Sequence, residues 1–157
     1  MTTSRLVPLP SRRATIALGA RLAGAAIGGD LLLLEGDLGA GKTFLARAIC
    51  RALGVPRTET VASPTFALVH EYDARVPIVH ADLYRLASPA DVRELGLREA
   101  RGDGAVVVAE WARAFAGELG DDGLVITLTG DGPTRRASLE PRGPRGEALA
   151  RVAAGEP

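Results

Sequence analysis

A glycine-rich segment, GDLGAGKT at residues 36–43, constrains the fold of this chain more than any other feature. Four leucines at 31–34 precede the segment, and a stretch with apolar residues at helical spacing, 43–53, follows it. A short apolar run that ends at glycine is typical of a strand buried on both faces. Because glycine adopts backbone conformations that other residues avoid, the segment can turn sharply from this strand into a helix.

The spacing of Gly36, Gly41, Lys42 and Thr43 is that of a phosphate-binding loop, or P-loop. Backbone N–H groups in such a loop point at a phosphate, and the helix that follows adds its positive N-terminal dipole. Lys42 is the only lysine in a chain that otherwise uses arginine. A compact ammonium fits this cradle, whereas a planar guanidinium would crowd it. A chance match is the alternative, but the flanking strand and helix argue for a nucleotide site.

Helix and turn signals in the rest of the chain indicate an α/β fold. We expect helices over residues 12–27 and 43–53, one beginning at Ser88-Pro89, and one beginning near 145. Strands are predicted at 31–35 and 105–109, and hairpins pair 66–72 with 77–84 and 123–129 with 134–140. The expected architecture is a three-layer, P-loop NTPase-like domain with a mixed, mainly parallel sheet and antiparallel hairpins. We expect one P-loop ATPase domain over residues 1–157.

Charge and composition narrow the class of protein. The formal net charge is zero, so the chain as a whole is not drawn to nucleic acid or membrane. Residues 1–57 carry eight basic and three acidic side chains, which suits an anionic ligand, whereas residues 58–123 carry six and twelve. The single cysteine, Cys50, excludes an internal disulfide. No apolar leader is visible and no apolar run is long enough to span a bilayer, so we expect a cytoplasmic protein with no membrane partner.

Two carboxylates are candidates for a metal site. Asp82 in IVHADLYR and Glu110 in AVVVAEW each end an apolar run, and such strand ends face the crevice where α/β sheets bind ligands. We expect Glu110 to bind Mg²⁺ and Asp82 to serve the site or the metal; the alternative is a pair of surface carboxylates. The chain has no asparagine, no glutamine and no second lysine, so it lacks the Asn-Lys-x-Asp segment that reads guanine. We therefore expect an adenine nucleotide.

Four motifs together resemble those of the bacterial TsaE (YjeE) family: GDLGAGKT, Ser63-Pro64-Thr65-Phe66, HADLYR at 80–85, and Glu110-Trp111. The resemblance covers nearly the whole chain. It implies an ATPase that acts with the proteins TsaD and TsaB in making N6-threonylcarbamoyladenosine, the modified base beside the anticodon in tRNAs that read codons starting with A. It further implies that ATP hydrolysis resets or regulates TsaD, and that tRNA is reached indirectly through the complex.

The resemblance also implies roles for individual residues. It assigns ATP binding to the loop, Thr43 and Glu110 to Mg²⁺, Asp82 to the active site, and Thr65 to a switch loop. Trp111 would lie beside the nucleotide, and the segment from Arg12 to Thr15 would line the adenine pocket. The C-terminal part of the chain is variable in the family, so a phosphate contact from Arg135 or Arg136 is a separate hypothesis that the resemblance does not supply. The loop residues concerned are Leu38, Gly39, Ala40, Gly41, Lys42 and Thr43.

Several alternatives stay open at this point. A small P-loop kinase of a hydroxylated metabolite would need an arginine lid, for which Arg93, Arg98 and Arg101 are available. A scaffold that binds ATP without turning it over is a second alternative. Residues 63–65 form either a switch that a γ-phosphate orders or an ordinary proline turn. His80 is interpreted as structural rather than as a metal ligand, since no second histidine has ligand spacing.

Overall fold

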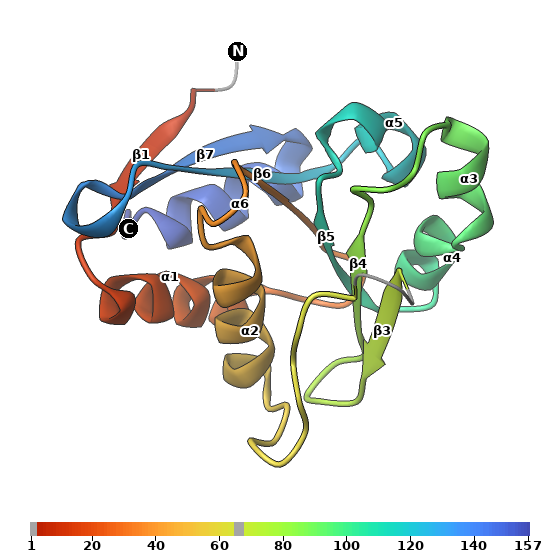
Figure 1. The fold of residues 1–157 in the computed structure, drawn as a ribbon, viewed down its shortest axis with the longest axis horizontal. Coiled ribbons are helices and arrows are strands. Elements are labelled where there is room, and N and C mark those ends of the chain that lie inside the picture. Colours follow the sequence, from red (N-terminus) through yellow and green to blue (C-terminus); the bar gives the residue numbers. More distant parts are fainter. Residues whose placement is uncertain (1–2, 65–67) are drawn as a thin grey trace.

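The computed structural model describes residues 3–64 and 68–157, and within them seven strands form one sheet with helices on both faces (Figure 1). The strand order is β1-β7-β6-β2-β5-β4-β3. The strands are β1 (Arg5–Pro8), β2 (Leu31–Glu35), β3 (Val69–Tyr72), β4 (Ile78–Asp82), β5 (Val106–Glu110), β6 (Gly123–Thr129) and β7 (Arg136–Arg142). The α-helices are α1 (Arg12–Ala25), α2 (Lys42–Leu53), α3 (Pro89–Glu94), α4 (Leu97–Gly102), α5 (Ala116–Leu119) and α6 (Gly143–Ala153).

The direction of the strands confirms the predicted mixed, mainly parallel sheet. β2 lies between β5 and β6 and is parallel to both, and β4 is parallel to β5. β3 and β7 run the other way, and β1 is antiparallel to β7. Both predicted hairpins are present, as the antiparallel pairs β3–β4 and β6–β7; residues 66–67 of the first predicted strand lie outside the described residues. Five strands therefore point the same way, and β2, β4 and β5 end at the same edge.

Alternation along the central strands divides the core into two layers. Leu32 and Leu34 pack with α1, α2 and α6, whereas Leu31 and Leu33 pack with α3, α4 and α5. This explains the unbroken apolar run in β2, because both of its faces are covered. Ile78 of β4 lies in the same layer as Leu32. Since side chains two apart share a face of a strand, the later residues His80 and Asp82 also face the layer of α2.

Three details differ from the sequence-based expectations. The four-residue edge strand β1 was not predicted; it is short, ends at a proline and depends on pairing with the distant β7. The predicted helix after Ser88 is divided in two at Gly96, which has a left-handed backbone conformation (φ +71°). The strand predicted at 105–109 lies at Val106–Glu110, which makes Glu110 its last residue.

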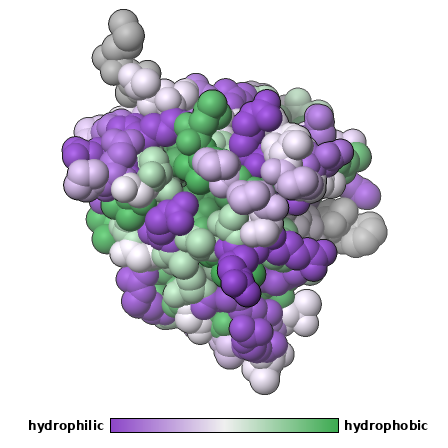
Figure 2. Space-filling view, turned by 90° about the vertical axis from the view of Figure 1, so that its left-hand side faces the viewer, coloured by the Kyte–Doolittle hydropathy of each residue, from purple (hydrophilic) through white to green (hydrophobic). Residues whose placement is uncertain are grey.

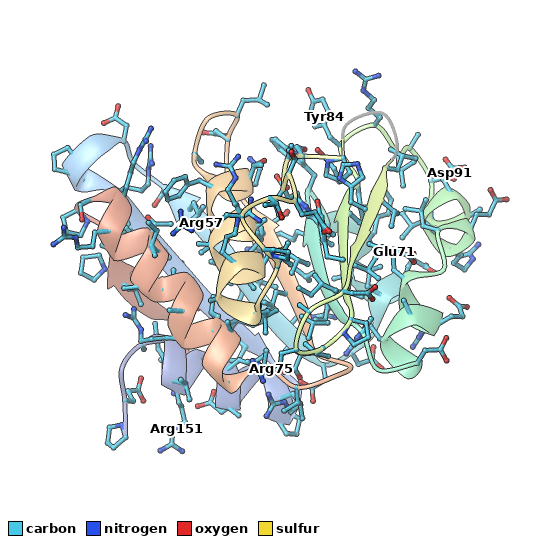
Figure 3. The ribbon with its side chains drawn as sticks, turned by 90° about the horizontal axis from the view of Figure 1, so that it is seen from below. Arg57, Glu71, Arg75, Tyr84, Asp91 and Arg151 are labelled. Atoms are coloured by element: carbon cyan, nitrogen blue, oxygen red, sulfur yellow. The ribbon has the colours of Figure 1, made fainter. Side chains whose placement is uncertain are left out.

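Figure 2 shows the face at the left of Figure 1, where apolar residues lie among hydrophilic ones. Seen from below, the labelled charged side chains Asp91 and Arg151 lie at the periphery of the fold (Figure 3). Across the residues that the structure describes, no helix is long and apolar enough to cross a membrane.

Helices α1 and α2 approach each other closely at a glycine. A Cβ atom placed on Gly19 of α1 would lie 2.8 Å from the Cβ of Ala48 of α2 and 3.1 Å from its carbonyl carbon. A contact this short forces a neighbour to move. Because α2 begins at the P-loop, this packing also fixes the helix whose first turn faces the candidate site.

We expect Gly19→Ala to destabilise the protein by about 1–3 kcal/mol, since it overpacks the contact between the two helices. Gly24→Ala is the matched control in the same helix: apart from its two chain neighbours and the helix's own backbone, no atom of residues 3–64 or 68–157 lies within 4 Å of its added Cβ. That change should be neutral or stabilising by up to about 1 kcal/mol, because alanine favours the helix. Urea unfolding of both variants checks this pair, and equal shifts in stability would contradict the close packing.

Candidate nucleotide-binding site

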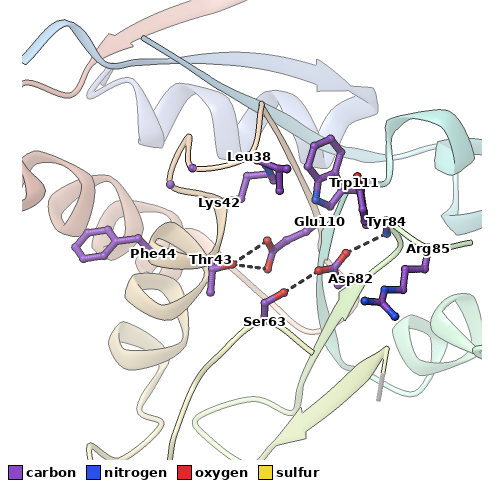
Figure 4. Close-up of a pocket in the computed structure, with 12 residues that line it drawn as sticks. Leu38, Lys42, Thr43, Phe44, Ser63, Asp82, Tyr84, Arg85, Glu110 and Trp111 are labelled. Atoms are coloured by element: carbon purple, nitrogen blue, oxygen red, sulfur yellow. Dashed lines mark hydrogen bonds between the residues drawn. The ribbon is translucent and has the colours of Figure 1, made fainter. Parts of the chain in front are cut away.

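A cavity of about 440 Å³ opens at the carboxyl ends of β4 and β5, beside the loop between β2 and α2 (Figure 4). It brings together nearly every motif that the sequence singled out. Its lining residues are Leu38, Gly39, Gly41, Lys42, Thr43, Phe44, Ser63, Asp82, Tyr84, Arg85, Glu110 and Trp111. The crevice at these strand ends is where open α/β sheets bind ligands.

The P-loop needs glycine at two positions for different reasons. Gly41, the residue before α2, has φ +108°, a left-handed conformation that side chains disfavour. Gly36 has φ +142°, and a Cβ there would lie 2.6 Å from the carbonyl oxygen of Leu128 in β6. The turn after β2 is therefore tight because it packs directly against the neighbouring strand. This geometry aims the start of α2 into the cavity.

Lys42 is only 5% exposed and contacts the loop that precedes it. Its Nζ donates hydrogen bonds to the carbonyl oxygens of Gly36 and Asp37, at 2.5 and 2.9 Å. It also lies 4.0 Å from the centre of the Trp111 ring, a cation–π contact. Burial lowers the pKa of Lys42, although nearby carboxylates, with Glu110 the foremost, oppose that shift. Its bonded oxygens are neutral, so a phosphate would be a stronger partner.

The two predicted carboxylates are direct neighbours, since Asp82 of β4 pairs in register with Glu110 of β5. Glu110 is 2% exposed and accepts a hydrogen bond from Thr43 Oγ1, 3.1 Å from its Oε1. Asp82 accepts from Ser63 Oγ at 2.7 Å and from the backbone N–H of Tyr84 at 3.0 Å. The structure thus brings Thr43, Glu110 and Asp82 into one cavity, as Figure 4 shows.

The donor atoms at this place suit Mg²⁺ in combination with a nucleotide. Thr43 supplies a hydroxyl and Glu110 and Asp82 supply carboxylates, all hard oxygen ligands. Among residues 3–64 and 68–157, no cluster of three or more His, Cys, Asp or Glu side chains could hold a metal ion by itself. Mg²⁺ is commonly bound by one or two carboxylates together with substrate phosphates. The residues present therefore fit a magnesium ion that arrives with the triphosphate.

Trp111 lines the cavity and has an unusual backbone conformation. Its φ is +59°, which is rare for a bulky residue, and its ring lies 4.9 Å from that of Tyr84. Neighbouring hydrogen bonds hold this conformation: the N–H of Trp111 donates to the carbonyl of Leu34, and Glu35 accepts from the N–H groups of Ala112 and Arg113. The sequence analysis did not predict that Glu35, the last residue of β2, holds the backbone after Trp111 in this way.

The residues predicted for the adenine pocket lie on α1. Arg12 is exposed and its guanidinium carbon is 5.6 Å from the centre of the Phe44 ring, on the helix that follows the P-loop. Thr15 is buried in α1. Their contact with a nucleotide stays a prediction. Thr65, the predicted switch threonine, lies outside the described residues.

Of two adjacent arginines, the structure places Arg135 at the P-loop. Its Nη1 lies 3.5 Å from the position that a Cβ on Gly41 would occupy. Its Nε is buried, with no hydrogen-bond partner in the part of the chain described. Arg136 is exposed at the start of β7, and its predicted phosphate contact remains a prediction. No sequence signal separates the two arginines, because Arg135 stands just before the strand whose alternation would orient it.

The sheet, the P-loop and the cavity define a protein with the fold of P-loop NTPases. The chain belongs to the TsaE family: the model of the family described as threonylcarbamoyl adenosine biosynthesis protein TsaE matches residues 9–137.

Individual relatives agree with this assignment. A "tRNA threonylcarbamoyladenosine biosynthesis protein TsaE" from Nostoc sp. is 37% identical over 139 residues, which cover 85% of this chain and 83% of the relative. The protein of the same name from Streptomyces coelicolor is 40% identical over 115 residues, covering 71% and 76%. The crystal structure of Bacillus subtilis YdiB superimposes with a TM-score of 0.81 at 30% identity, covering 99% of this chain and 97% of that one.

Lys42→Ala should weaken ATP binding by about 1.5–3 kcal/mol, because it removes a charge-assisted contact to phosphate. Lys42→Arg should retain part of the affinity, since it keeps the charge but not the compact shape. Isothermal titration calorimetry measures both affinities, with circular dichroism confirming that the variants are folded. An alanine variant that binds ATP as tightly as the wild-type protein would refute the assignment of this loop to phosphate.

Proposed function

We propose that this protein binds ATP with Mg²⁺ and hydrolyses it slowly, as an accessory ATPase in the N6-threonylcarbamoylation of tRNA adenosine beside the anticodon. It acts in the cytoplasm with TsaD and TsaB, and ATP turnover resets or regulates TsaD. The observation that carries the ATPase part is the hydrogen bond between Thr43 of the P-loop helix and Glu110 at the end of β5. Family membership and the names of the relatives support the role in tRNA modification.

The residues around the cavity divide the work of binding a triphosphate. The P-loop N–H groups and the start of α2 favour the negative phosphates, and Lys42 adds a full charge. Thr43, Glu110 and Asp82 would hold Mg²⁺, which neutralises charge on the β- and γ-phosphates when it is bound. Arg135 lies at the P-loop, and its buried Nε has no hydrogen-bond partner among the residues described, which supports a further contact from this side chain to the nucleotide.

Hydrolysis then needs an oriented water. The water oxygen attacks the γ-phosphorus, the bond from that phosphorus to the β–γ bridging oxygen breaks, and ADP and phosphate leave. We assign the orientation of the water to Asp82: it also accepts hydrogen bonds, from Ser63 and the N–H of Tyr84, but it is more exposed than Glu110, at 8% against 2%. The chain has no glutamine, the residue that positions water in other P-loop enzymes. We therefore expect slow turnover by the protein alone.

The surroundings of the cavity support a dependence on partner proteins. Leu38 at the tip of the P-loop is 77% exposed, and Tyr84 on the opposite rim is 58% exposed. Figure 3 shows Tyr84 extending outward at the edge of the molecule. Ser63, the first residue of the proposed switch, is joined to the site through its bond to Asp82. A partner that covers this rim would contact the switch next to Ser63 and complete the site, as in other nucleotide-dependent switches.

Two of the three arginines that a kinase would need as a lid over ATP are bonded elsewhere in the structure. Arg101 donates hydrogen bonds to the carbonyls of Gly29, Leu119 and Asp122, at the end of the sheet opposite the cavity. Arg93 forms an ion pair with Glu118 on the helical layer away from α2. Neither residue is placed over the P-loop, which favours the accessory ATPase.

The proposal is tested by titrating TsaD–TsaB into the protein with ATP, with ADP and without nucleotide. We expect ATP to strengthen the complex and the complex to accelerate ATP hydrolysis, because coupling between two binding sites is reciprocal. Glu110→Gln should still bind ATP and the partners but lose most Mg²⁺-dependent hydrolysis, since the amide keeps the shape without the charge. Equal affinity in all three nucleotide states would contradict the switch. Turnover that rises only with a small hydroxylated metabolite would favour the kinase.

A further inference from the structure

A histidine with no role in the proposed chemistry lies directly behind the carboxylate of the metal site. His80, in the middle of β4, is completely buried, and its Nε2 lies 2.6 Å from Oε2 of Glu110. We propose that His80 is a positioning residue: it holds one carboxylate oxygen of Glu110, so that the other stays on Thr43 and the nucleotide-bound Mg²⁺. This inference rests on the proposed function.

The two strands fix this contact through their register. His80 pairs with Val108 of β5, and Glu110 is two residues further along the same face of that strand. The imidazole therefore reaches diagonally to the strand end, where Thr43 approaches from α2. The histidine and the threonine contact the carboxylate from separate elements, one from the sheet and one from the helix.

Hydrogen-bond chemistry determines the direction of the contact. An ionised carboxylate only accepts hydrogen bonds, so the proton between the two groups is assigned to Nε2 of His80. Nδ1 is buried and has no hydrogen-bond partner among the described residues. A neutral imidazole with its proton on Nε2 and a lone pair on Nδ1 agrees with both observations. Among the described residues, the one polar contact of the His80 side chain is therefore with Glu110.

Packing alone does not require a histidine at this position. The preceding residues of β4, Ile78 and Val79, are buried and apolar, and a leucine of similar volume would continue that pattern. Glu110 does require a donor, because a carboxylate that is 2% exposed has lost nearly all its water. Without His80, the remaining side-chain hydrogen bonds of Glu110 among the described residues are the longer ones from Thr43 Oγ1, 3.1 Å to Oε1 and 3.4 Å to Oε2. The carboxylate would then be free to rotate away from the metal position.

Residues that orient metal ligands in this way typically change metal affinity by about 10–100-fold when they are replaced. The effect should fall on the metal and spare the nucleotide phosphates, since among the described residues the hydrogen bond of His80 goes to Glu110 and not to the P-loop or Lys42. Metal affinity and nucleotide affinity therefore separate a positioning residue from one that only supports the fold.

The experiment compares two amide variants. In His80→Gln the side-chain amide reaches the position of Nε2 and can donate to Glu110, whereas in His80→Asn the shorter amide cannot. His80→Leu removes the donor and keeps an apolar side chain of similar size. His70→Leu is the matched control, because His70 of β3 pairs directly with His80 but has no contact with Glu110 among its hydrogen bonds.

Electron paramagnetic resonance measures the binding of Mn²⁺, in place of Mg²⁺, to each variant loaded with a non-hydrolysable ATP analogue, and calorimetry measures ATP affinity in EDTA. We expect His80→Asn and His80→Leu to lose about 10–100-fold in Mn²⁺ affinity with unchanged ATP affinity in EDTA. His80→Gln and His70→Leu should resemble the wild-type protein.

Two results would overturn the inference while leaving the proposed function intact. One is wild-type Mn²⁺ affinity in His80→Asn; the other is an equal loss of metal and EDTA-measured ATP affinity, as from a damaged fold. A wild-type protein that binds no Mn²⁺ with the analogue would instead overturn both proposals. If His80→Leu does not fold, the comparison of the two amides decides the question.

Discussion

The buried carboxylate of Glu110 is the contact on which the site depends. It accepts hydrogen bonds from Thr43 at the start of α2 and from His80 in β4, while it belongs to β5 itself. One side chain therefore connects the P-loop helix to two adjacent strands. Because a carboxylate this deeply buried is costly unless it is bonded, the three elements have to keep their relative positions. A nucleotide site assembled from separate segments needs such a fixed point.

The sheet provides the frame for that contact. β2, β4 and β5 run parallel and end at one edge, so the P-loop, Asp82 and Glu110 emerge side by side. Alternation along β4 turns His80 and Asp82 toward the same layer as α2. The close approach of Gly19 to Ala48 then holds α2 against α1. The alternation of side chains along the strands and the packing of α1 on α2 thus determine where the phosphate-binding loop lies.

Much of this arrangement was predictable from the sequence because its signals are local. The P-loop spacing, the apolar runs and the carboxylates that end them predicted a cavity with Lys42, Thr43, Asp82 and Glu110 in it. What could not be predicted depends on distant pairing. β1 forms only by pairing with the distant β7. Arg135 lies at the P-loop because the chain just before β7 passes beside that loop. The contact of His80 with Glu110 depends on the register between β4 and β5, although alternation with Asp82 was a signal for its direction.

A crystal structure with Mg²⁺ and a non-hydrolysable ATP analogue tests the central claim most directly. We expect the β- and γ-phosphates in the cradle of residues 36–43, with Lys42 Nζ moved from the carbonyls of Gly36 and Asp37 to phosphate oxygens. The metal should lie about 2.0–2.1 Å from Thr43 Oγ1, bound also by phosphate and held directly or through water by Glu110. Two results would contradict this assignment of the site: a triphosphate bound elsewhere, or a metal that contacts neither Thr43 nor Glu110, directly or through water.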